Sequence, residues 1–142
     1  MKIRPYFETD EAAVVDLWRR CEVTRPWNDP HKDIVRKLAV QRELFLVAQC
    51  DDRIVGTVMA GYEGHRGWIN YLAVDPDDRR LGYGRALMAE AERLLRARGC
   101  PKINLQVRAG NDGAIAFYER LGFADDKVVS FGKRLEHDEA AS

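Results

Sequence analysis

Hydrophobic positions near the start of the chain recur at helical spacing. They fall at i, i+3, i+4 and i+7, which predicts an amphipathic helix over residues 11–21 with one face packed against a core. A short strand, Ile3–Tyr6, is expected before this helix. The helix-spaced positions are Val14, Leu17, Trp18 and Cys21.

A second helix is predicted after a loop that contains two prolines. The Asp29 side chain can cap its first turn, and Pro30 suits the first helical position because its missing N–H needs no partner there. Ile34 and Leu38 then supply an apolar stripe. In the preceding loop, Trp27 is expected either to cover the core between the two helices or to face a substrate.

Three apolar runs in the middle of the chain are short and rich in β-branched or aromatic residues. The turns between them, residues 51–53 and 63–67, are polar or rich in glycine. This pattern predicts a meander of three antiparallel strands. The strands are Leu44–Cys50, Ile54–Tyr62 and Trp68–Val74.

The rest of the chain alternates helix and strand, which predicts a strand parallel to Trp68–Val74. The expected order is βααβββαβαβ, one mixed α/β (α+β) domain over residues 1–142 with a flexible tail from about residue 136. The predicted elements are a helix from the turn at 79–85 to Gly99, a strand Lys102–Val107, a helix Ala114–Leu121 capped by Asn111, and a last strand Val128–Leu135.

Composition narrows the class of protein. The 142 residues include 23 basic and 23 acidic side chains, so no overall field favours nucleic acid or an anionic membrane as a partner. The three cysteines are far apart and form no metal-binding pattern, which suits a reducing cytoplasm and predicts no metal site and no cysteine acyl-enzyme. No apolar run reaches the roughly 20 residues that span a membrane.

The basic glycine turn, residues 79–85, is the strongest functional signal. A glycine turn that opens a helix gathers unpaired N–H groups at the positive end of the helix dipole, which is a phosphate site. A P-loop requires Lys followed by Ser or Thr after its last glycine, but Arg85 and Ala86 follow here. A dinucleotide fingerprint requires a third small residue, where this chain has Leu87, and an acidic residue after the next strand, where it has Arg108.

The turn Arg79-Arg80-Leu81-Gly82-Tyr83-Gly84 instead resembles the coenzyme A signature of the GCN5-related N-acetyltransferases (the GNAT family). Leu72-Ala73-Val74-Asp75-Pro76 precedes it as in that family, and Asn111, Ala114, Phe117, Tyr118, Gly122 and Phe123 follow at the spacing of the family's closing motif. Three further segments, at 25–30, 64–67 and 132–135, are similar to one bacterial member. The resemblance covers nearly the whole chain.

The resemblance implies a fold in which two central strands splay apart to admit acetyl-CoA. The strand backbone would hold the pantetheine arm, the glycine turn would hold the pyrophosphate, and Tyr118 would act as the general acid that protonates the departing thiolate. It implies these cofactor-binding residues: Leu72, Ala73, Val74, Arg79, Arg80, Leu81, Gly82, Tyr83, Gly84, Arg85, Asn111 and Tyr118.

The general base is not assigned by the resemblance. Family members that acetylate ribosomal-protein N-termini have a glutamate five positions before the asparagine, whereas this chain has Gln106, which cannot accept a proton at neutral pH. Glu63 is the candidate base, and His65 is an alternative that would act through a water. Both residues can equally be plain polar residues of a turn.

The leading hypothesis is therefore an acetyl-CoA-dependent N-acetyltransferase in which a primary amine attacks the thioester directly. The acceptor is either a small amine or amino acid, or a protein N-terminus or lysine. A wide neutral groove would favour a protein, and a closed pocket lined by Trp27 and Arg25 would favour a small ligand. The alternative class is a non-catalytic coenzyme A-binding sensor or scaffold. A homodimer is expected if the last strand has a free edge.

Overall fold

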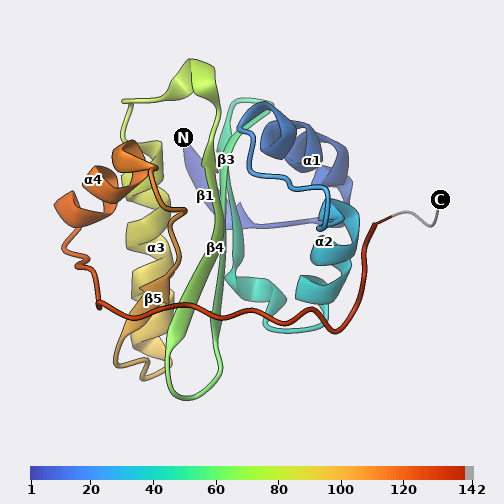
Figure 1. Ribbon diagram of the computed structural model, residues 1–142. Helices are drawn as coiled ribbons and strands as arrows, with labels where there is room; N and C mark the ends of the chain where they lie inside the picture. Colours follow the sequence, from blue (N-terminus) through green and yellow to red (C-terminus); the bar gives the residue numbers. More distant parts are fainter. Residues whose placement is uncertain (140–142) are drawn as a thin grey trace.

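Five strands form one sheet, with helices on both of its faces, in the computed structural model, which describes residues 1–139 (Figure 1). Helices α1 and α2 cover one face, and α3 and α4 lie on the other. In chain order the elements are β1 (Lys2–Pro5), α1 (Glu11–Arg20), α2 (Pro30–Leu38), β2 (Phe45–Cys50), β3 (Arg53–Tyr62), β4 (Gly67–Val74), α3 (Tyr83–Ala97), β5 (Ile103–Leu105) and α4 (Asp112–Arg120).

The strands lie in the order β1-β2-β3-β4-β5. All neighbours are antiparallel except β4 and β5, which are parallel and are joined through α3. This arrangement confirms the predicted meander and the predicted parallel strand. The two predicted helix caps are also confirmed. The Asp29 carboxylate accepts a hydrogen bond from the His31 N–H, and the Asn111 side chain accepts one from the Ala114 N–H.

Alternate residues of the central strands supply two hydrophobic cores. On β2, Phe45 and Val47 face α1 and α2, whereas Leu46 and Ala48 face α3, as strand alternation requires. The sheet is therefore buried on both faces in its middle. Trp18 of α1 is fully buried in the first core, where its ring stacks on Phe45.

A β-bulge interrupts the pairing of β3 with β4. Thr57 pairs with Ala73, but Met59 pairs with Asn70, so β4 carries one extra residue between the two pairs. Within it, Tyr71 has φ +51°, a left-handed conformation that is uncommon for a residue with a side chain. Two hydrogen bonds hold the bulge, because the Thr57 hydroxyl donates to the Tyr71 carbonyl (2.8 Å) and the Tyr71 hydroxyl donates to Asp33 (2.7 Å).

The bulge explains why β5 is shorter than expected. The sequence predicts a strand over 102–107, but only Ile103–Leu105 pairs with β4, opposite Gly67–Ile69. Beyond Ile69 the bulged strand turns away from β5. Strand pairing therefore stops where the two strands separate.

The predicted last strand, Val128–Leu135, is wrong, because this segment has no regular secondary structure. Phe131 is 93% exposed and Val128 76% exposed. High β-propensity requires a partner strand to be realised, and the contact of this segment near β5 is between side chains, where Gln106, just after β5, donates to Ser130. The strand through which a dimer contact was expected is thus absent from the described residues.

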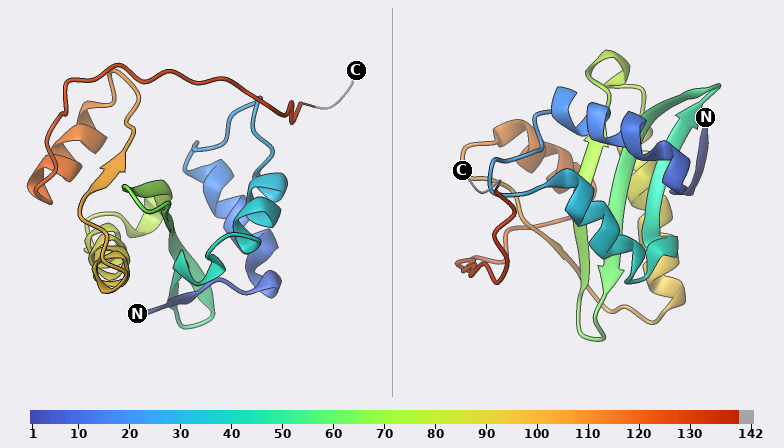
Figure 2. Two further views of the ribbon diagram at one scale, coloured as in Figure 1. Left: turned by 90° about the horizontal axis from the view of Figure 1, so that it is seen from below. Right: turned by 90° about the vertical axis from the view of Figure 1, so that its right-hand side faces the viewer.

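The segment after α4 instead crosses the molecule to reach α2 (Figure 2). At α2 the segment is held by Asp138, whose side chain is only 1% exposed and pairs with Arg36 at 2.7 Å. Asp138 also accepts a hydrogen bond from the Asp29 N–H (3.1 Å). Of the tail predicted from residue 136, residues 140–142 lie outside the described part of the chain. No helix within 1–139 is long and apolar enough to cross a membrane.

Replacing Thr57 tests whether its hydroxyl stabilises the bulge. Thr57 is fully buried and also accepts a hydrogen bond from the indole N–H of Trp18 (2.8 Å). Thr57→Val keeps the shape but leaves that N–H and the Tyr71 carbonyl without a partner, so we expect a loss of about 1–3 kcal/mol in the free energy of unfolding.

Urea denaturation measures this loss, with the exposed Thr9→Val as the matched control. The control should stay within about 0.5 kcal/mol of the wild type. Equal stability of Thr57→Val and the wild type would contradict the assigned role of the hydroxyl.

Candidate active site

The glycine turn leaves a run of backbone donors without acceptors. Gly82 has φ +84°, a left-handed conformation that suits glycine, and α3 begins at the next residue. The N–H groups from Leu81 to Arg85 donate to no acceptor within residues 1–139, and the first donor in the helix is the Ala86 N–H. These amides lie at the positive end of the α3 dipole and therefore form an anion site.

The second glycine of the turn has a packing role. A Cβ on Gly84 would lie 3.3 Å from Cζ of Phe117 on α4, which is tighter than ordinary contact. Gly84 thereby lets the start of α3 approach α4. Gly82 has open space around it, so only its backbone conformation requires glycine.

Nearby arginines differ in whether their charge is already neutralised. Arg20 pairs with Asp75 at 2.7 Å, and Arg53 pairs with Asp78 at 2.5 Å, lowering the pKa of that carboxyl. The acidic break after β4 is thus compensated by other parts of the chain. Within residues 1–139, no carboxylate lies in ion-pair distance of the three arginines around the turn, Arg79, Arg80 and Arg85.

A cleft of about 1100 Å³ opens where β4 and β5 separate. Its lining includes the bulged strand at Tyr71 and Leu72, Asn111 at the N-terminal cap of α4, and Tyr118 in the last turn of α4. Three of the residues predicted for the site, Leu72, Asn111 and Tyr118, are therefore brought together. Ala73 is buried on the same strand, next to Leu72 and Val74.

Tyr118 lies in an apolar environment. Its ring packs edge-on against Phe117 and Phe123, with centroids 5.1 and 5.7 Å away. Burial raises the pKa of Tyr118 to about 12. Its hydroxyl therefore stays protonated at neutral pH and is able to donate a proton.

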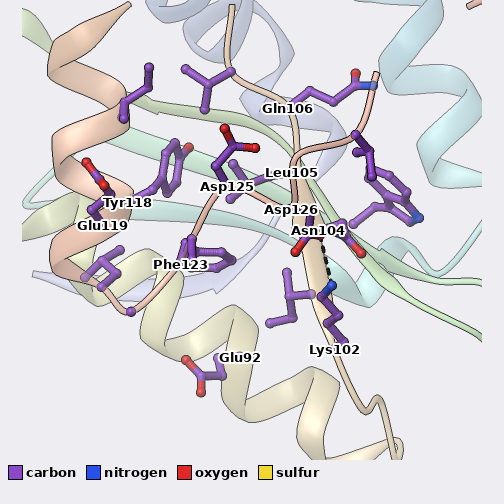
Figure 3. A pocket seen from close by; sticks show the side chains of 18 of the residues that line it. Glu92, Lys102, Asn104, Leu105, Gln106, Tyr118, Glu119, Phe123, Asp125 and Asp126 are labelled. Atoms are coloured by element: carbon purple, nitrogen blue, oxygen red, sulfur yellow. Dashed lines mark hydrogen bonds and ion pairs between the residues drawn. The ribbon is translucent and has the colours of Figure 1, made fainter. Parts of the chain in front are cut away.

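A second cavity, of about 860 Å³, lies against β5 and α4 on the side of α3 (Figure 3). Tyr118 and Phe123 line it, and Asp126 closes part of it by pairing with Lys102 at 2.9 Å and with Asn104 at 2.8 Å. Tyr118 borders both cavities, as do Leu105, Gln106, Val107 and Ser130. The first cleft is the candidate site, since it alone of the two contains the bulged strand and Asn111.

The two candidate bases do not reach this cleft. Glu63 and His65 are exposed on the turn between β3 and β4, and neither lines either cavity. The Glu63 carboxylate accepts hydrogen bonds from the N–H groups of Arg66 and His65, which lower its pKa and make it a weaker base. Gln106, which cannot accept a proton at neutral pH, lines the cleft.

Several cleft residues were not predicted from the sequence. Asp33 and Tyr71 meet there from α2 and β4, and Arg108 enters from the loop after β5. Trp27 is 40% exposed, and the Arg108 guanidinium lies 5.5 Å from its ring centroid. Trp27 is therefore not a lid on the core. Of Asp33, Tyr71 and Arg108, only Arg108 lies close in the sequence to a predicted site residue, because it precedes Asn111 by three positions.

Comparison with known proteins identifies the family of this chain. The sequence model of the "Acetyltransferase (GNAT) family" matches residues 12–123. Acetyltransferase ECA0875 of Pectobacterium atrosepticum is 50% identical over 97% of this chain and 98% of its own length. Acetyltransferase YE1169 of Yersinia enterocolitica is 48% identical over 98% of this chain and 99% of its own length.

Solved structures show the same fold. The ribosomal-protein-S18-alanine N-acetyltransferase of Escherichia coli is similar with a TM-score of 0.75 and 28% identity, covering 89% of this chain and 79% of that one. An aminoglycoside 6'-N-acetyltransferase of Acinetobacter haemolyticus has a TM-score of 0.76 at 22% identity, over 96% of this chain and 100% of that one. The chain belongs to the GNAT acetyltransferase family and is an N-acetyltransferase.

Proposed function

We propose that this enzyme transfers the acetyl group of acetyl-CoA to a primary amine by direct attack in a ternary complex. The observation that carries the proposal is the cleft between β4 and β5, where bulged strand backbone, Asn111 and Tyr118 surround one space. The glycine turn lies next to it, because Gly84 packs on Phe117, the neighbour of Tyr118. One molecule of acetyl-CoA has both the pyrophosphate and the thioester that these two features suit.

The free edge of β4 suits the pantetheine arm. The Asp75 N–H donates to Val55 of β3 (2.8 Å), so by strand alternation the N–H of Val74 points to the opposite edge. Leu72 lies two residues earlier on that same edge. β5 does not pair there, and the backbone groups are available to an amide-containing arm. The open amides of 81–85, together with Arg79, Arg80 and Arg85, would hold the pyrophosphate.

The transfer needs one bond made and one broken. The acceptor nitrogen attacks the thioester carbon, the carbon–sulfur bond breaks, and the sulfur leaves with the electron pair. The Tyr118 hydroxyl would give its proton to that thiolate, and the acceptor nitrogen would lose a proton to solvent. An unpaired N–H of the bulged strand would stabilise the oxyanion that forms in between.

Replacing the proposed acid tests its role. Tyr118→Phe should lower kcat at least about tenfold, a modest loss for a general acid because a thiol of pKa near 8.5 is already a good leaving group. Release of free thiol over a panel of amines and peptide N-termini measures it. Tyr62→Phe, on a strand outside the cleft, is the matched control.

A wild-type kcat in Tyr118→Phe would exclude the general-acid role. Binding of acetyl-CoA by the wild type with no turnover of any amine would instead favour a sensor or scaffold. No observation in residues 1–139 favours that class.

The raised pKa of Tyr118 predicts the shape of the pH profile. With a pKa of about 12, the phenol remains protonated well beyond the range in which an ordinary tyrosine ionises. We expect kcat at saturating acceptor to show no falling limb between about pH 8 and about pH 10.5. A fall with a midpoint near 10, absent in Tyr118→Phe, would contradict this account.

The backbone of the turn is tested at its left-handed glycine. Alanine in this conformation costs roughly 1–2 kcal/mol, so in Gly82→Ala the turn should relax and move its amides. We expect the Kd for acetyl-CoA, measured by calorimetry, to rise about tenfold. Gly113→Ala is the matched control, because Gly113 lies in α4 with open space around it and no positive φ. Equal affinity in the two variants would remove the turn from the binding site.

A further inference from the structure

We propose that the acceptor is a small primary amine that also carries a carboxylate, and that Arg25 and Arg108 bind this carboxylate. The inference rests on the proposed function and names the class of acceptor for the same cleft. Its basis is the distribution of charge around the cleft, together with the segment after α4, whose Ser130 lines the cleft.

Arg25 lies on the loop between α1 and α2 and lines the cleft. It is positioned by backbone, since its guanidinium donates to the carbonyls of Glu22 (2.8 Å) and Thr24 (3.0 Å). These neutral carbonyls leave its charge uncompensated. No carboxylate of residues 1–139 lies in ion-pair distance of it.

Arg108 lines the same cleft from the opposite wall, on the loop after β5. Its guanidinium carbon lies 5.5 Å from the ring centroid of Trp27, two residues along the chain from Arg25. This contact joins the loop that carries Arg25 to the loop that carries Arg108, and both arginines line the cleft. In the described chain Arg108 has no carboxylate partner either.

The other cations of the cleft are already satisfied. Arg36 pairs with Asp138 at 2.7 Å and with Asp33 at 3.1 Å. Lys37 donates to the Ala60 carbonyl, and burial lowers its pKa. The charged residues that line the cleft are the cations Arg25, Arg36, Lys37 and Arg108 and the carboxylates Glu22 and Asp33.

This balance favours an acceptor with an anionic group. Asp33 is engaged by Arg36 and by the Tyr71 hydroxyl, so Glu22, exposed at the rim, is the one carboxylate of the cleft with no bonded cation in residues 1–139. The two guanidinium groups that line the cleft without a carboxylate partner in residues 1–139 exceed what Glu22 can neutralise. A guanidinium matches a carboxylate through two parallel hydrogen bonds, which is the strongest pairing available to it.

The segment after α4 limits the size of the acceptor. It runs from α4 to α2 (Figure 2), and Ser130 of this segment lines the cleft. It is fastened at its far end, where Arg134 donates to Asn28 (2.6 Å) and Asp138 pairs with Arg36. A folded protein would have to displace these contacts, whereas a small amine would not.

The test compares amines that differ only in the charge of one group. A panel of α- and ω-amino acids is assayed beside the carboxamide of each, with acetyl-CoA as donor and thiol release as readout. The wild type should show a kcat/KM for its best amino acid at least about tenfold above that of the matching carboxamide. The carboxamide amine is less basic, which by itself would favour the carboxamide.

Arg25→Gln and Arg108→Gln should each lower kcat/KM for the amino acids by about tenfold to about a hundredfold, the range of a charge-assisted hydrogen bond. Both should leave kcat/KM for the carboxamides and the Kd for acetyl-CoA within about twofold. Arg120→Gln, an exposed arginine at the end of α4 outside both cavities, is the matched control and should change neither class.

Equal or better turnover of the carboxamides or of peptide N-termini by the wild type would overturn this inference and leave the N-acetyltransferase proposal intact. An equal loss for acids and carboxamides in the two variants would also overturn it, because it would assign the arginines a structural or cofactor role. Failure of the proposed function is distinct, since the wild type would then release no thiol with any amine.

Discussion

The extra residue in β4 is the constraint on which the rest of the site depends. At Tyr71 the strand changes register against β3, so that β4 and β5 pair only as far as Ile69. The separation creates the cleft and leaves one edge of β4 without a partner strand. Three contacts support the strained conformation of Tyr71. Its carbonyl accepts a hydrogen bond from the buried Thr57 hydroxyl, its ring stacks on Trp18, and its hydroxyl donates to Asp33. The same contacts bring α1 and α2 against the site.

Electrostatic pairing gives a neutral chain two local positive regions. Arg20, Arg53 and Arg36 each neutralise an aspartate that is largely buried. Near the cleft, the arginines without a carboxylate partner in residues 1–139 lie at the glycine turn and on the two loops that carry Arg25 and Arg108. Overall composition gives no net charge that would favour nucleic acid, and it reveals neither region, because both regions depend on which charges are paired in three dimensions.

What could be predicted from the sequence was local or carried by the family motif. The caps at Asp29 and Asn111 and the strands of the meander depend on neighbouring residues, and all of them formed. The last strand did not, because a strand needs a partner and propensity cannot supply one. Residues brought together from different elements were also missed. Asp33 and Tyr71 are 38 positions apart, and no periodicity links a residue of α2 with the bulge.

The central claim is that the bulged strand and the glycine turn bind one molecule of acetyl-CoA. Amide hydrogen exchange resolved by NMR, with and without acetyl-CoA, tests it most directly, because within residues 1–139 the amides of 81–85 donate to no acceptor and β5 does not pair with Leu72 or Val74. The account predicts slower exchange from Leu81 to Arg85 and at Leu72 and Val74, with β1 and β2 unchanged. Saturating acetyl-CoA that slows exchange elsewhere, and leaves both of these stretches as they were, would contradict it.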